Sequence, residues 1–314
     1  MVKYTYLFYV WWYGGKKLGL GKDFELDKIL SECSLEEQYI TNTDLDENEL
    51  KEIFDDFIKA YSDLEKLYKQ EFENLVTNVP GVHSISGRIK DPNHLIGKII
   101  RNSNDKPDKY NGITKENYYK LITDLVGFRI IVLNKNDWVI INEALNNLYK
   151  KDPEKYINTP EDYLKNYKTD KKQPAYYAEK PKVYITASDS EDEIIKYEKA
   201  EIEVDKSRNN YRSLHYIIKK EKFYFEIQVR SLFEEGWLEF EHRVLYPNDR
   251  KNQRKKEYVQ ILNNLSKAAD GLISFYDRYQ DAIPNAVDTE HKKEPEKLKQ
   301  NDSEFDYVDQ LDFK

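Results

Sequence analysis

Residues 210–242 read NYRSLHYIIKKEKFYFEIQVRSLFEEGWLEFEH. Two apolar runs flank the polar break at Lys219–Lys222, a pattern that predicts two strands joined by a turn, and a helical pattern follows through Trp237 to His242. Because side chains alternate between the two faces of a strand, we expect polar groups from both strands to face one cleft. An ordinary amphipathic sheet with a polar solvent face is the alternative interpretation. The polar groups are Tyr211, Ser213 and His215 on the first strand and Tyr224, Glu226, Gln228 and Arg230 on the second.

The composition is that of an acidic globular chain. Its 314 residues are 39% hydrophobic and 34% charged, with a formal net charge of −8. This acidic balance argues against a protein that coats nucleic acids, but it permits a local basic patch. The single cysteine, Cys33, excludes an internal disulfide and is typical of a reducing cytoplasm, which is the predicted location. No run of about 18 apolar residues is present, so no transmembrane helix is expected, and the aromatic run at 4–13 predicts a buried strand or, alternatively, an aromatic binding surface.

A basic cluster is expected in the first third of the chain. Residues 47–76 carry apolar side chains at helical spacing, which predicts a long amphipathic helix packed on the main domain. Residues 86–90 are expected to be extended, and Asp91–Pro92 is a strong helix start. Free amide groups at a helix N-terminus favour anions, so basic residues there suit a polyphosphate; a solvated basic surface is the plainer alternative. These residues are Arg88, Lys90 and Lys98.

A central sheet is expected around a buried strand at 127–133, with Asp124 just before it. Four later runs predict an antiparallel meander on this strand: 182–187, 197–204, 211–218 and 223–230, the first two joined by an acidic turn at 188–193. The fold class predicted is therefore α+β, with a mixed, mostly antiparallel sheet flanked by helices. Its remaining parts are a loop at 103–112, helices at 115–125 and 137–150, and an irregular polar insertion at 151–181.

The chain after His242 is expected to be helical and then disordered. Basic residues at 250–256 lead into an amphipathic helix that reaches Tyr276. The charged tail has too few apolar residues to fold, apart from a candidate short segment at 305–313. The predicted organisation is an N-terminal extension at 1–46, a main domain at 47–245, a C-terminal helical element at 246–284 and a disordered tail at 285–314.

Two acids stand where neighbouring strands would bring them together. Asp124 lies at the mouth of a buried strand and Glu226 lies mid-strand on a polar face, so the pair could hold one Mg²⁺ ion that shares phosphate oxygens. With Arg129, the basic cluster would neutralise a triphosphate, which suits phosphoryl transfer by positioning and charge stabilisation. The sequence has no GxxxxGKS/T loop, no kinase signature set and no zinc-ligand spacing among its five histidines. Candidates for the acceptor are Tyr211 by stacking, Gln228 and Glu235 by hydrogen bonds to a base, and His215 and Arg230.

Four motifs resemble the synthetase domain of the RelA/SpoT alarmone synthetases. They are RIKDPNHLIGK at 88–98, DLVGFR at 124–129, NYRSLH at 210–215, and EIQVRS from 226 with WLEFEH ending at 242. Each motif alone is weak, but the four in family order are specific and span residues 85–245. The resemblance implies a fold related to nucleotidyltransferases and transfer of the β,γ-pyrophosphate of ATP to a ribose 3′-hydroxyl.

The resemblance also implies roles for single residues. Asp124 and Glu226 would be the catalytic, Mg²⁺-binding pair, and Glu226 is a candidate to assist deprotonation of the 3′-hydroxyl. The groups implied for ATP phosphates are Arg88, Lys90, Lys98 and Arg129. Those implied for the acceptor nucleotide are Tyr211, Ser213, His215, Gln228, Arg230 and Glu235.

Three positions depart from the family pattern. His94 stands where the family usually has Ser, and Asn210 where it usually has Gly; Asn tolerates a left-handed backbone better than most residues, so the turn can survive. Glu235 stands where Asn or Asp is usual, which places the identity of the acceptor in question. No histidine is followed by aspartate, so the hydrolase domain of the family is not expected.

Three functions remain open. The first is a small alarmone synthetase that makes ppGpp or pppGpp from ATP and GDP or GTP. The second is a toxic small synthetase that modifies the tRNA 3′ end or adenine nucleotides, with the terminal helices as an antitoxin or homo-oligomer surface and Tyr276–Tyr279 as a candidate self-inhibitory segment. The third is an inactive nucleotide-binding module. The second rests on a lysine-rich insertion near 168–172 and on a candidate tRNA surface at Arg250, Lys251, Arg254, Lys255 and Lys256.

Overall fold

The computed structural model describes residues 23–41, 43–149, 176–186, 189–207, 211–245 and 252–282. Two compact units divide the chain, Met1–Ser274 and Phe275–Lys314. Within the described residues, no helix combines the length and apolar character needed to cross a membrane.

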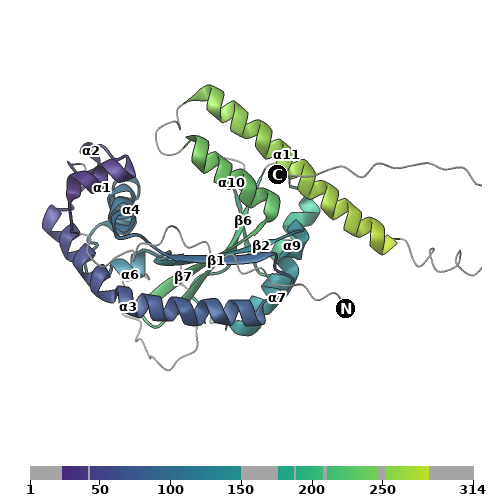
Figure 1. Cartoon of the computed structure of the whole chain (residues 1–314), viewed down its shortest axis with the longest axis horizontal. Coiled ribbons are helices and arrows are strands. Elements are labelled where there is room, and N and C mark those ends of the chain that lie inside the picture. Colours follow the sequence, from purple (N-terminus) through teal and green to yellow (C-terminus); the bar gives the residue numbers. More distant parts are fainter. Residues whose placement is uncertain are drawn as a thin grey trace, which may run out of the picture. The chain divides into compact units, whose positions relative to one another are not determined.

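A seven-stranded sheet forms the centre of the first unit, in the order β1-β2-β7-β6-β4-β5, with β3 paired to β6 (Figure 1). Pairing is parallel between β2 and β7 and between β4 and β5, and antiparallel elsewhere, so the predicted mixed α+β class is confirmed. The strands are β1 Ser84–Ile89, β2 Val126–Val132, β3 Tyr176–Tyr177, β4 Lys182–Ile185, β5 Glu203–Lys206, β6 Ser213–Lys220 and β7 Phe223–Ser231.

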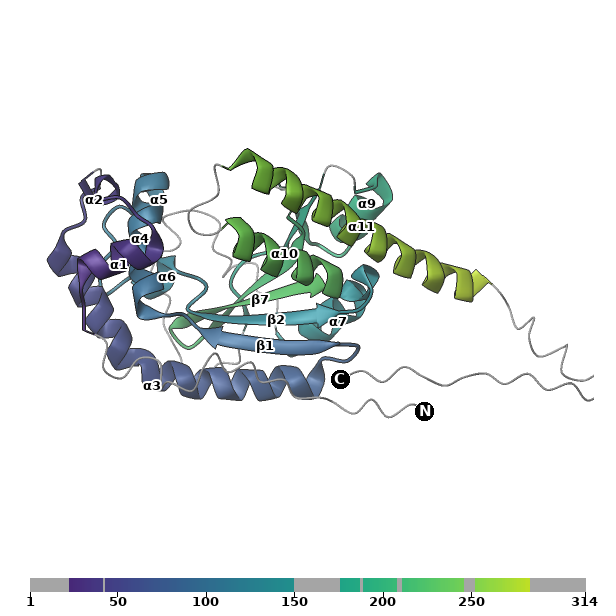
Figure 2. The same ribbon diagram turned by 45° about the horizontal axis from the view of Figure 1, so that its top comes forward.

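Helices cover both faces and one end of this sheet. The helices are α1 Leu26–Cys33, α2 Gln38–Thr41, α3 Glu47–Asn78, α4 Pro92–Asp105, α5 Pro107–Tyr110, α6 Tyr118–Leu121, the 3₁₀ turn η1 Lys135–Asp137, α7 Trp138–Leu148, α9 Glu191–Lys199, α10 Leu232–Leu245 and α11 Gln253–Ala282. Figure 2 shows α3 and α10 on opposite faces of the strands. The predicted helices at 47–76 and 137–150 are therefore present.

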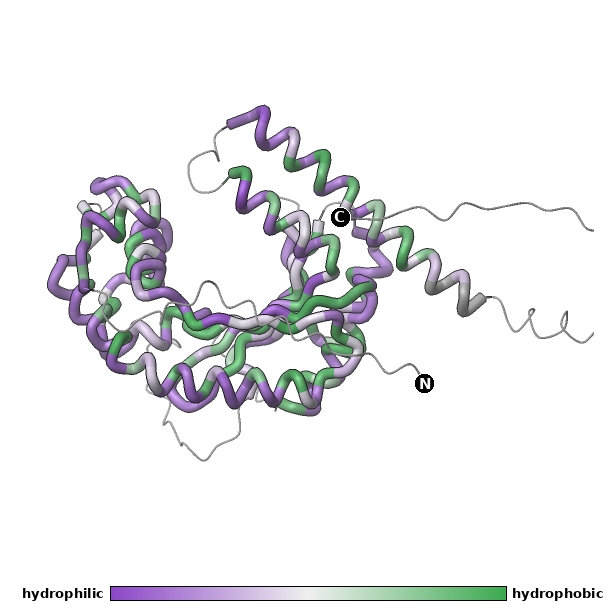
Figure 3. Tube along the Cα trace, viewed as in Figure 1, coloured by the Kyte–Doolittle hydropathy of each residue, from purple (hydrophilic) through white to green (hydrophobic). Residues whose placement is uncertain are grey.

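The two faces of β2 carry different kinds of residue: Phe128 packs in the hydrophobic core against α3, and Arg129 lies on the face that carries the polar site residues. Phe128 points to α3, where its ring stacks on Tyr68 with centroids 5.4 Å apart and planes inclined by 5°. A side chain at Gly87, beside it on β1, would meet both rings at 2.6–2.9 Å, so the close approach of α3 requires glycine there. The next residue of β2, Arg129, points to α10, which the alternation of a strand dictates. Figure 3 shows α3 as a helix with mixed apolar and polar positions, as its packing against the strands requires.

The β6–β7 hairpin confirms the strand, turn and strand pattern that opens at residue 211. Lys220 pairs with Phe223, so the turn consists of two residues, and Glu221 adopts a φ of 54°. This left-handed conformation is typical of two-residue hairpin turns. The hairpin places the polar positions of both strands on the face that α10 covers.

The helix start at Asp91–Pro92 is also confirmed. The Asp91 side chain accepts hydrogen bonds from the backbone N–H groups of Asn93 and His94, at 2.9 and 3.3 Å. Pro92 occupies the first turn, where its missing N–H costs nothing.

The predicted strand at 197–204 is wrong. Residues 191–199 form α9, because Ser190 and Glu193 build a reciprocal capping box and three acids fill the first turn. The predicted turn at 188–193 is thus the start of a helix. Since α9 crosses over between β4 and β5, these strands run parallel, and the antiparallel meander is limited to β4, β6 and β7.

The region from 103 to 125 also differs from its prediction. The expected loop at 103–112 is partly helical, since α4 continues to Asp105 and α5 follows it. The expected helix at 115–125 is reduced to the single turn α6. Tyr118 is fully buried there and donates a hydrogen bond to Asp56 of α3 at 3.0 Å, so tertiary packing decides the local conformation.

Candidate active site

Asp124 lies between two lysines at one end of β2. Its Oδ2 is 2.6 Å from Lys90 Nζ and its Oδ1 is 2.8 Å from Lys98 Nζ. Lys90 directly follows β1 and is fixed by its backbone N–H, which donates to the Leu125 carbonyl at 2.8 Å. Lys98 reaches the same carboxylate from the second turn of α4. The three side chains are 9–31% exposed, so the triad is largely withdrawn from solvent.

Burial and charge act in opposite directions in this triad. Burial would raise the pKa of Asp124, but the two lysines bring it well below its ordinary value. For Lys90, burial lowers the pKa, and the charge of Lys98 adds to this effect while Asp124 opposes it. Asp124 is consequently held in its ionised form at neutral pH, with the ammonium groups of Lys90 and Lys98 beside it.

Glu226 occupies the adjacent strand, where it pairs with Gly127 in the parallel register of β2 and β7. Its Oε1 lies 3.1 Å from His215 Nδ1, and its Oε2 accepts a hydrogen bond from Gln228 Nε2 at 2.7 Å. Burial would raise its pKa, but the interaction with His215 outweighs burial and holds the pKa below the ordinary value. The charge of Asp124 also raises the pKa of Glu226, so the two carboxylates share one electrostatic field.

A chain of hydrogen bonds leads from Arg230 to Glu226. Arg230 Nη2 donates to Tyr211 Oη at 2.8 Å, and Tyr211 Oη lies 2.8 Å from His215 Nε2. When His215 Nδ1–H donates to Glu226, its neutral ring can accept the Tyr211 proton at Nε2. Arg230 Nε also donates to Ser213 at 3.1 Å, and the Arg230 side chain is 7% exposed. The whole chain is therefore fixed by buried partners.

Glu235 joins two arginines at the first turn of α10. Its Oε1 accepts from Arg129 Nη1 at 2.7 Å and its Oε2 accepts from Arg230 Nη1 at 2.6 Å. Arg129 makes a second ion pair with the more exposed Glu239 at 2.6 Å. Both oxygens of Glu235 are thus engaged by guanidinium groups of the sheet.

A family model described as "Region found in RelA / SpoT proteins" matches residues 87–251, more than half of the chain. The chain belongs to the RelA/SpoT family. The resemblance of the four motifs is therefore confirmed, and all the residues discussed above lie inside the matched region. No curated protein matches the sequence.

Solved structures with similar folds share little sequence with this RelA/SpoT chain. A GTP pyrophosphokinase family protein from Streptococcus pneumoniae is 16% identical with a TM-score of 0.43, over 73% of this chain and 93% of that one. Small alarmone synthetase 1 from Bacillus subtilis bound to its product pppGpp is 18% identical with a TM-score of 0.43, over 71% and 100%. The same synthetase bound to AMPCPP is 16% identical with a TM-score of 0.43, over 71% and 100%.

Most of the predicted site residues of the RelA/SpoT region come together, and two positions stand apart. Arg88 is exposed on β1 opposite Gly127, and its charge still contributes to lowering the pKa of Lys90. His94 is 55% exposed on α4, with Nδ1 3.9 Å from Asp91. Asn210, Arg250, Lys251 and the runs at 4–13, 168–172 and 305–313 lie outside the described residues, whereas Arg254, Lys255 and Lys256 begin α11.

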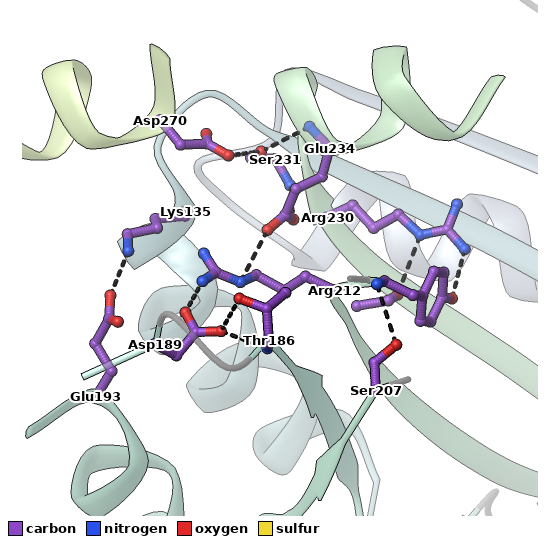
Figure 4. A network of polar contacts seen from close by, with 12 residues as sticks. Lys135, Thr186, Asp189, Glu193, Ser207, Arg212, Arg230, Ser231, Glu234 and Asp270 are labelled. Atoms are coloured by element: carbon purple, nitrogen blue, oxygen red, sulfur yellow. Dashed lines mark hydrogen bonds and ion pairs between the residues drawn. The ribbon is translucent and has the colours of Figure 1, made fainter. Parts of the chain in front are cut away.

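A second polar cluster was missed by sequence reasoning (Figure 4). Arg212 pairs with Asp189, and its Nε lies 3.4 Å from Glu234 Oε1. Ser231 donates to Asp270 at 2.8 Å, which ties the end of β7 to α11. Burial raises the pKa of Glu234 to about 7, Asp270 adds to this effect and Arg212 opposes it. Arg212 and Glu234 also line a small pocket beside Arg230.

Neighbouring positions in the motifs could have indicated this cluster. Arg212 lies between Tyr211 and Ser213, and strand alternation directs it away from the face that they share. No periodic pattern, however, links these residues to Asp189 or to Asp270.

The donor set can be tested against the Mg²⁺ ion expected for the family. Among the described residues, no group of three or more His, Cys, Asp and Glu side chains is placed to hold a metal. Mg²⁺ in nucleotide sites needs only one or two carboxylates, because water and substrate phosphates supply the other oxygens. Asp124, just before β2, and Glu226, on the adjacent strand β7, both have a lowered pKa and fit that requirement.

Proposed function

We propose that the chain is an ATP-dependent pyrophosphokinase that transfers the β,γ-pyrophosphate of ATP to the 3′-hydroxyl of GDP or GTP. One observation carries the proposal. Two carboxylates have a lowered pKa: Asp124, in the turn before β2 and between two lysines, and Glu226, on the neighbouring strand β7 beside the half-buried His215. This arrangement offers cations to a polyphosphate and a carboxylate to a hydroxyl, side by side.

On the donor side, Lys90 and Lys98 bind the phosphates of ATP while Asp124 keeps both ammonium groups in place. Arg88 adds a charge from β1, and it has no carboxylate partner within ion-pair distance among the described residues. Such preformed charges stabilise the transition state of phosphoryl transfer, where positioning and electrostatics supply most of the catalysis. A Mg²⁺ ion held by Asp124 and Glu226 would supply further neutralisation of the pyrophosphate.

On the acceptor side, Glu226 orients the 3′-hydroxyl. The hydroxyl oxygen forms a bond to the β-phosphorus of ATP, the bond from that phosphorus to the α,β-bridging oxygen breaks, and AMP leaves. The hydroxyl proton passes to Glu226. His215 and Gln228 each hold one carboxylate oxygen, so the geometry of this proton acceptor is fixed before substrate arrives.

The test is a transfer assay with γ-labelled ATP, Mg²⁺ and separate samples of GDP, GTP, ADP, ATP and deacylated tRNA. Label should appear on guanine nucleotides and should fall by at least about 100-fold in Glu226→Gln, as expected when an electrostatic group of the transition state is lost. Glu203→Gln is the matched control, because Glu203 lies on edge strand β5 and pairs with Lys182. Absence of label on every acceptor, with ATP still bound, would leave a nucleotide-binding module instead.

The competing function is transfer to the 3′ end of tRNA. It is supported by Arg254 and Lys256, which are exposed at the start of α11. The net charge of −8 opposes it, because tRNA is a polyanion. Label on tRNA alone would replace the guanine-nucleotide proposal with this one.

A further inference from the structure

The polar face of the sheet continues beyond β6 onto β4. In the antiparallel register of these two strands, Tyr184 is opposite Ser213 and Lys182 is opposite His215. Cross-strand partners lie on the same face, whereas Val183, between the two β4 residues, is buried on the other face. Tyr184 therefore lies beside the acceptor half of the proposed site, on a strand outside the four sequence motifs.

The ring of Tyr184 contacts two other aromatic rings of this site. Its centroid is 5.0 Å from that of His215, with the planes inclined by 69°, and 5.7 Å from that of Tyr211, with the planes inclined by 59°. The rings of Tyr211 and His215 are 5.9 Å apart and inclined by 85°. Inclined pairs at these distances are favourable aromatic contacts. The three rings thus form one cluster, in which Tyr184 is half-buried.

Tyr211 depends on side-chain contacts for its position. It precedes β6, so it lies outside the pairing of β6 with β4 and with β7. Hydrogen-bond partners hold its hydroxyl, because Arg230 Nη2 and His215 Nε2 each lie 2.8 Å from Tyr211 Oη. The contact with Tyr184 acts on the ring instead, and so restricts how the ring can tilt about its fixed hydroxyl end.

His215 receives support from the same ring. Its Nδ1 lies 3.1 Å from Glu226 and its Nε2 lies 2.8 Å from Tyr211 Oη, so both nitrogens have a partner. The Tyr184 ring adds a third contact, which is the shortest ring-to-ring distance of the cluster. Burial is the main cause that raises the pKa of Tyr184, and the charge of Glu226 adds to this effect. Tyr184 therefore lies within the electrostatic field of the proposed proton acceptor.

We propose that Tyr184 is a positioning residue for the acceptor nucleotide, whose ring holds Tyr211 and His215 in the orientation in which they serve the acceptor. The inference rests on the proposed function, in which Tyr211 stacks on the acceptor base and His215 holds Glu226. The Tyr184 hydroxyl makes no hydrogen bond with any residue that the structure describes, so the positioning role belongs to the ring.

The first test compares Tyr184→Leu with Tyr184→Phe. GDP is titrated into the full-length protein by calorimetry in the presence of AMPCPP and Mg²⁺. Tyr184→Leu removes both ring contacts and should weaken GDP binding by about 10-fold, since one aromatic pair is worth roughly 2- to 12-fold in an equilibrium constant. Tyr184→Phe retains the ring and should bind GDP within about 2-fold of the wild-type protein. Unchanged GDP binding in Tyr184→Leu, or an equal loss in both variants, would overturn the proposal.

Tyr119→Leu is the matched control. Tyr119 is also half-buried, and its ring lies 6.4 Å from that of Phe223, with the planes inclined by 72°. Strand alternation places Phe223 on the face of β7 opposite to Glu226. The control variant therefore loses a similar aromatic contact away from the acceptor half and should keep the wild-type affinity for GDP. An equal loss of GDP binding in Tyr119→Leu would overturn a specific role for Tyr184. Far-UV circular dichroism checks that each variant is folded.

The transfer assay separates this inference from the proposed activity. In Tyr184→Leu the KM for GDP should rise by about 10-fold while the KM for ATP stays within about 2-fold, because Lys90 and Lys98 do not depend on β4. An equal rise in both KM values would overturn the positioning role. A wild-type protein that transfers no label contradicts the proposed function, and a GDP affinity that still falls in Tyr184→Leu alone supports the role of Tyr184 independently. A wild-type protein that binds no GDP would overturn both.

Discussion

Asp124 and Glu234 are two buried carboxylates in the same unit with opposite behaviour. Their side chains are 17% and 13% exposed, so desolvation disfavours the charged form of both. Asp124 has two lysine ammonium groups within 2.8 Å, whereas Glu234 has one guanidinium at 3.4 Å and the negative charge of Asp270 nearby. The pKa of Asp124 is lowered and that of Glu234 is raised to about 7. Burial raises the pKa of both acids, and the number of neighbouring cations decides whether that effect prevails, as at Glu234, or is outweighed, as at Asp124.

This difference separates the proposed phosphate site from a structural contact between β7, α10 and α11. A carboxylate that is always ionised holds cations in place for phosphates. A carboxylate that is neutral below about pH 7 instead tolerates a buried position in the first turn of α10, where β7 ends.

The largest effect is expected for Asp124→Asn. The change leaves the buried Lys90 and the half-buried Lys98 without their carboxylate partner, which should lower the free energy of unfolding by roughly 3 kcal/mol. Pyrophosphate transfer should fall by at least about 100-fold, because the lysines lose their fixed positions. Urea unfolding and the transfer assay measure the two effects.

A second substitution separates stability from function in that variant. Adding Lys98→Met removes one unpaired cation and should recover part of the stability while transfer stays low. An unchanged free energy of unfolding in Asp124→Asn would show that the lysines do not depend on this carboxylate.

The intermediate effect concerns Glu234 and pH. Its folded pKa of about 7 lies above its ordinary value of 4.5, so the folded state retains a proton that the unfolded state has released. Folding therefore takes up a proton between about pH 4.5 and 7, and stability must fall as pH rises through that window. The loss should be about 3.5 kcal/mol, at roughly 1.4 kcal/mol per pKa unit over the interval from 4.5 to about 7.

Glu234→Gln removes this titration and should flatten the pH dependence of the unfolding free energy between pH 5 and 8. Glu203→Gln, at an exposed edge strand, serves as the control and should retain the wild-type slope. An equal slope in Glu234→Gln and the wild-type protein would mean that Arg212 keeps Glu234 ionised throughout.

The smallest effect is expected for Glu239→Gln. Glu239 is 62% exposed and shares Arg129 with Glu235, which is 16% exposed. Surface ion pairs contribute little, so the free energy of unfolding should change by less than about 0.5 kcal/mol. Glu235→Gln should cost more, because Arg230 is buried and would lose its carboxylate partner. If urea unfolding shows a larger loss of stability for Glu239→Gln than for Glu235→Gln, burial does not determine how much these ion pairs contribute to stability.

The sequence predicted local elements well and their pairing less well. The helix that begins at Pro92 was predictable because Asp91 and Pro92 are strong local signals. The helix at 191–199 was missed because residues 188–193 were interpreted as an acidic turn and residues 197–204 as a strand, although Ser190 and Glu193 form a capping box. The parallel pairing of β4 with β5 depended on that helix, so one local error changed the topology.

In the candidate site, too, local patterns were predictable and the contacts between distant residues were not. Tyr211, His215 and Glu226 were predictable as a group because strand alternation places them on one face. Their order as a hydrogen-bonded chain was not predictable, since it depends on side-chain geometry. Asp270 was beyond sequence reasoning because α11 returns to Ser231 across a long stretch of chain.

The hydrogen-bonded chain from Arg230 to Glu226 has one further consequence, which concerns its direction. A guanidinium can only donate, so Tyr211 accepts from Arg230; with a neutral His215 that carries its proton on Nδ1, Tyr211 donates to His215 and His215 donates to Glu226. Every link thus has the same polarity, and the chain ends at an acceptor that already receives hydrogen bonds from His215 and Gln228. A molecule that approaches the remaining lone pairs of Glu226 must bring a donor. The fold therefore admits a hydroxyl at this point and turns away a carbonyl or phosphate oxygen.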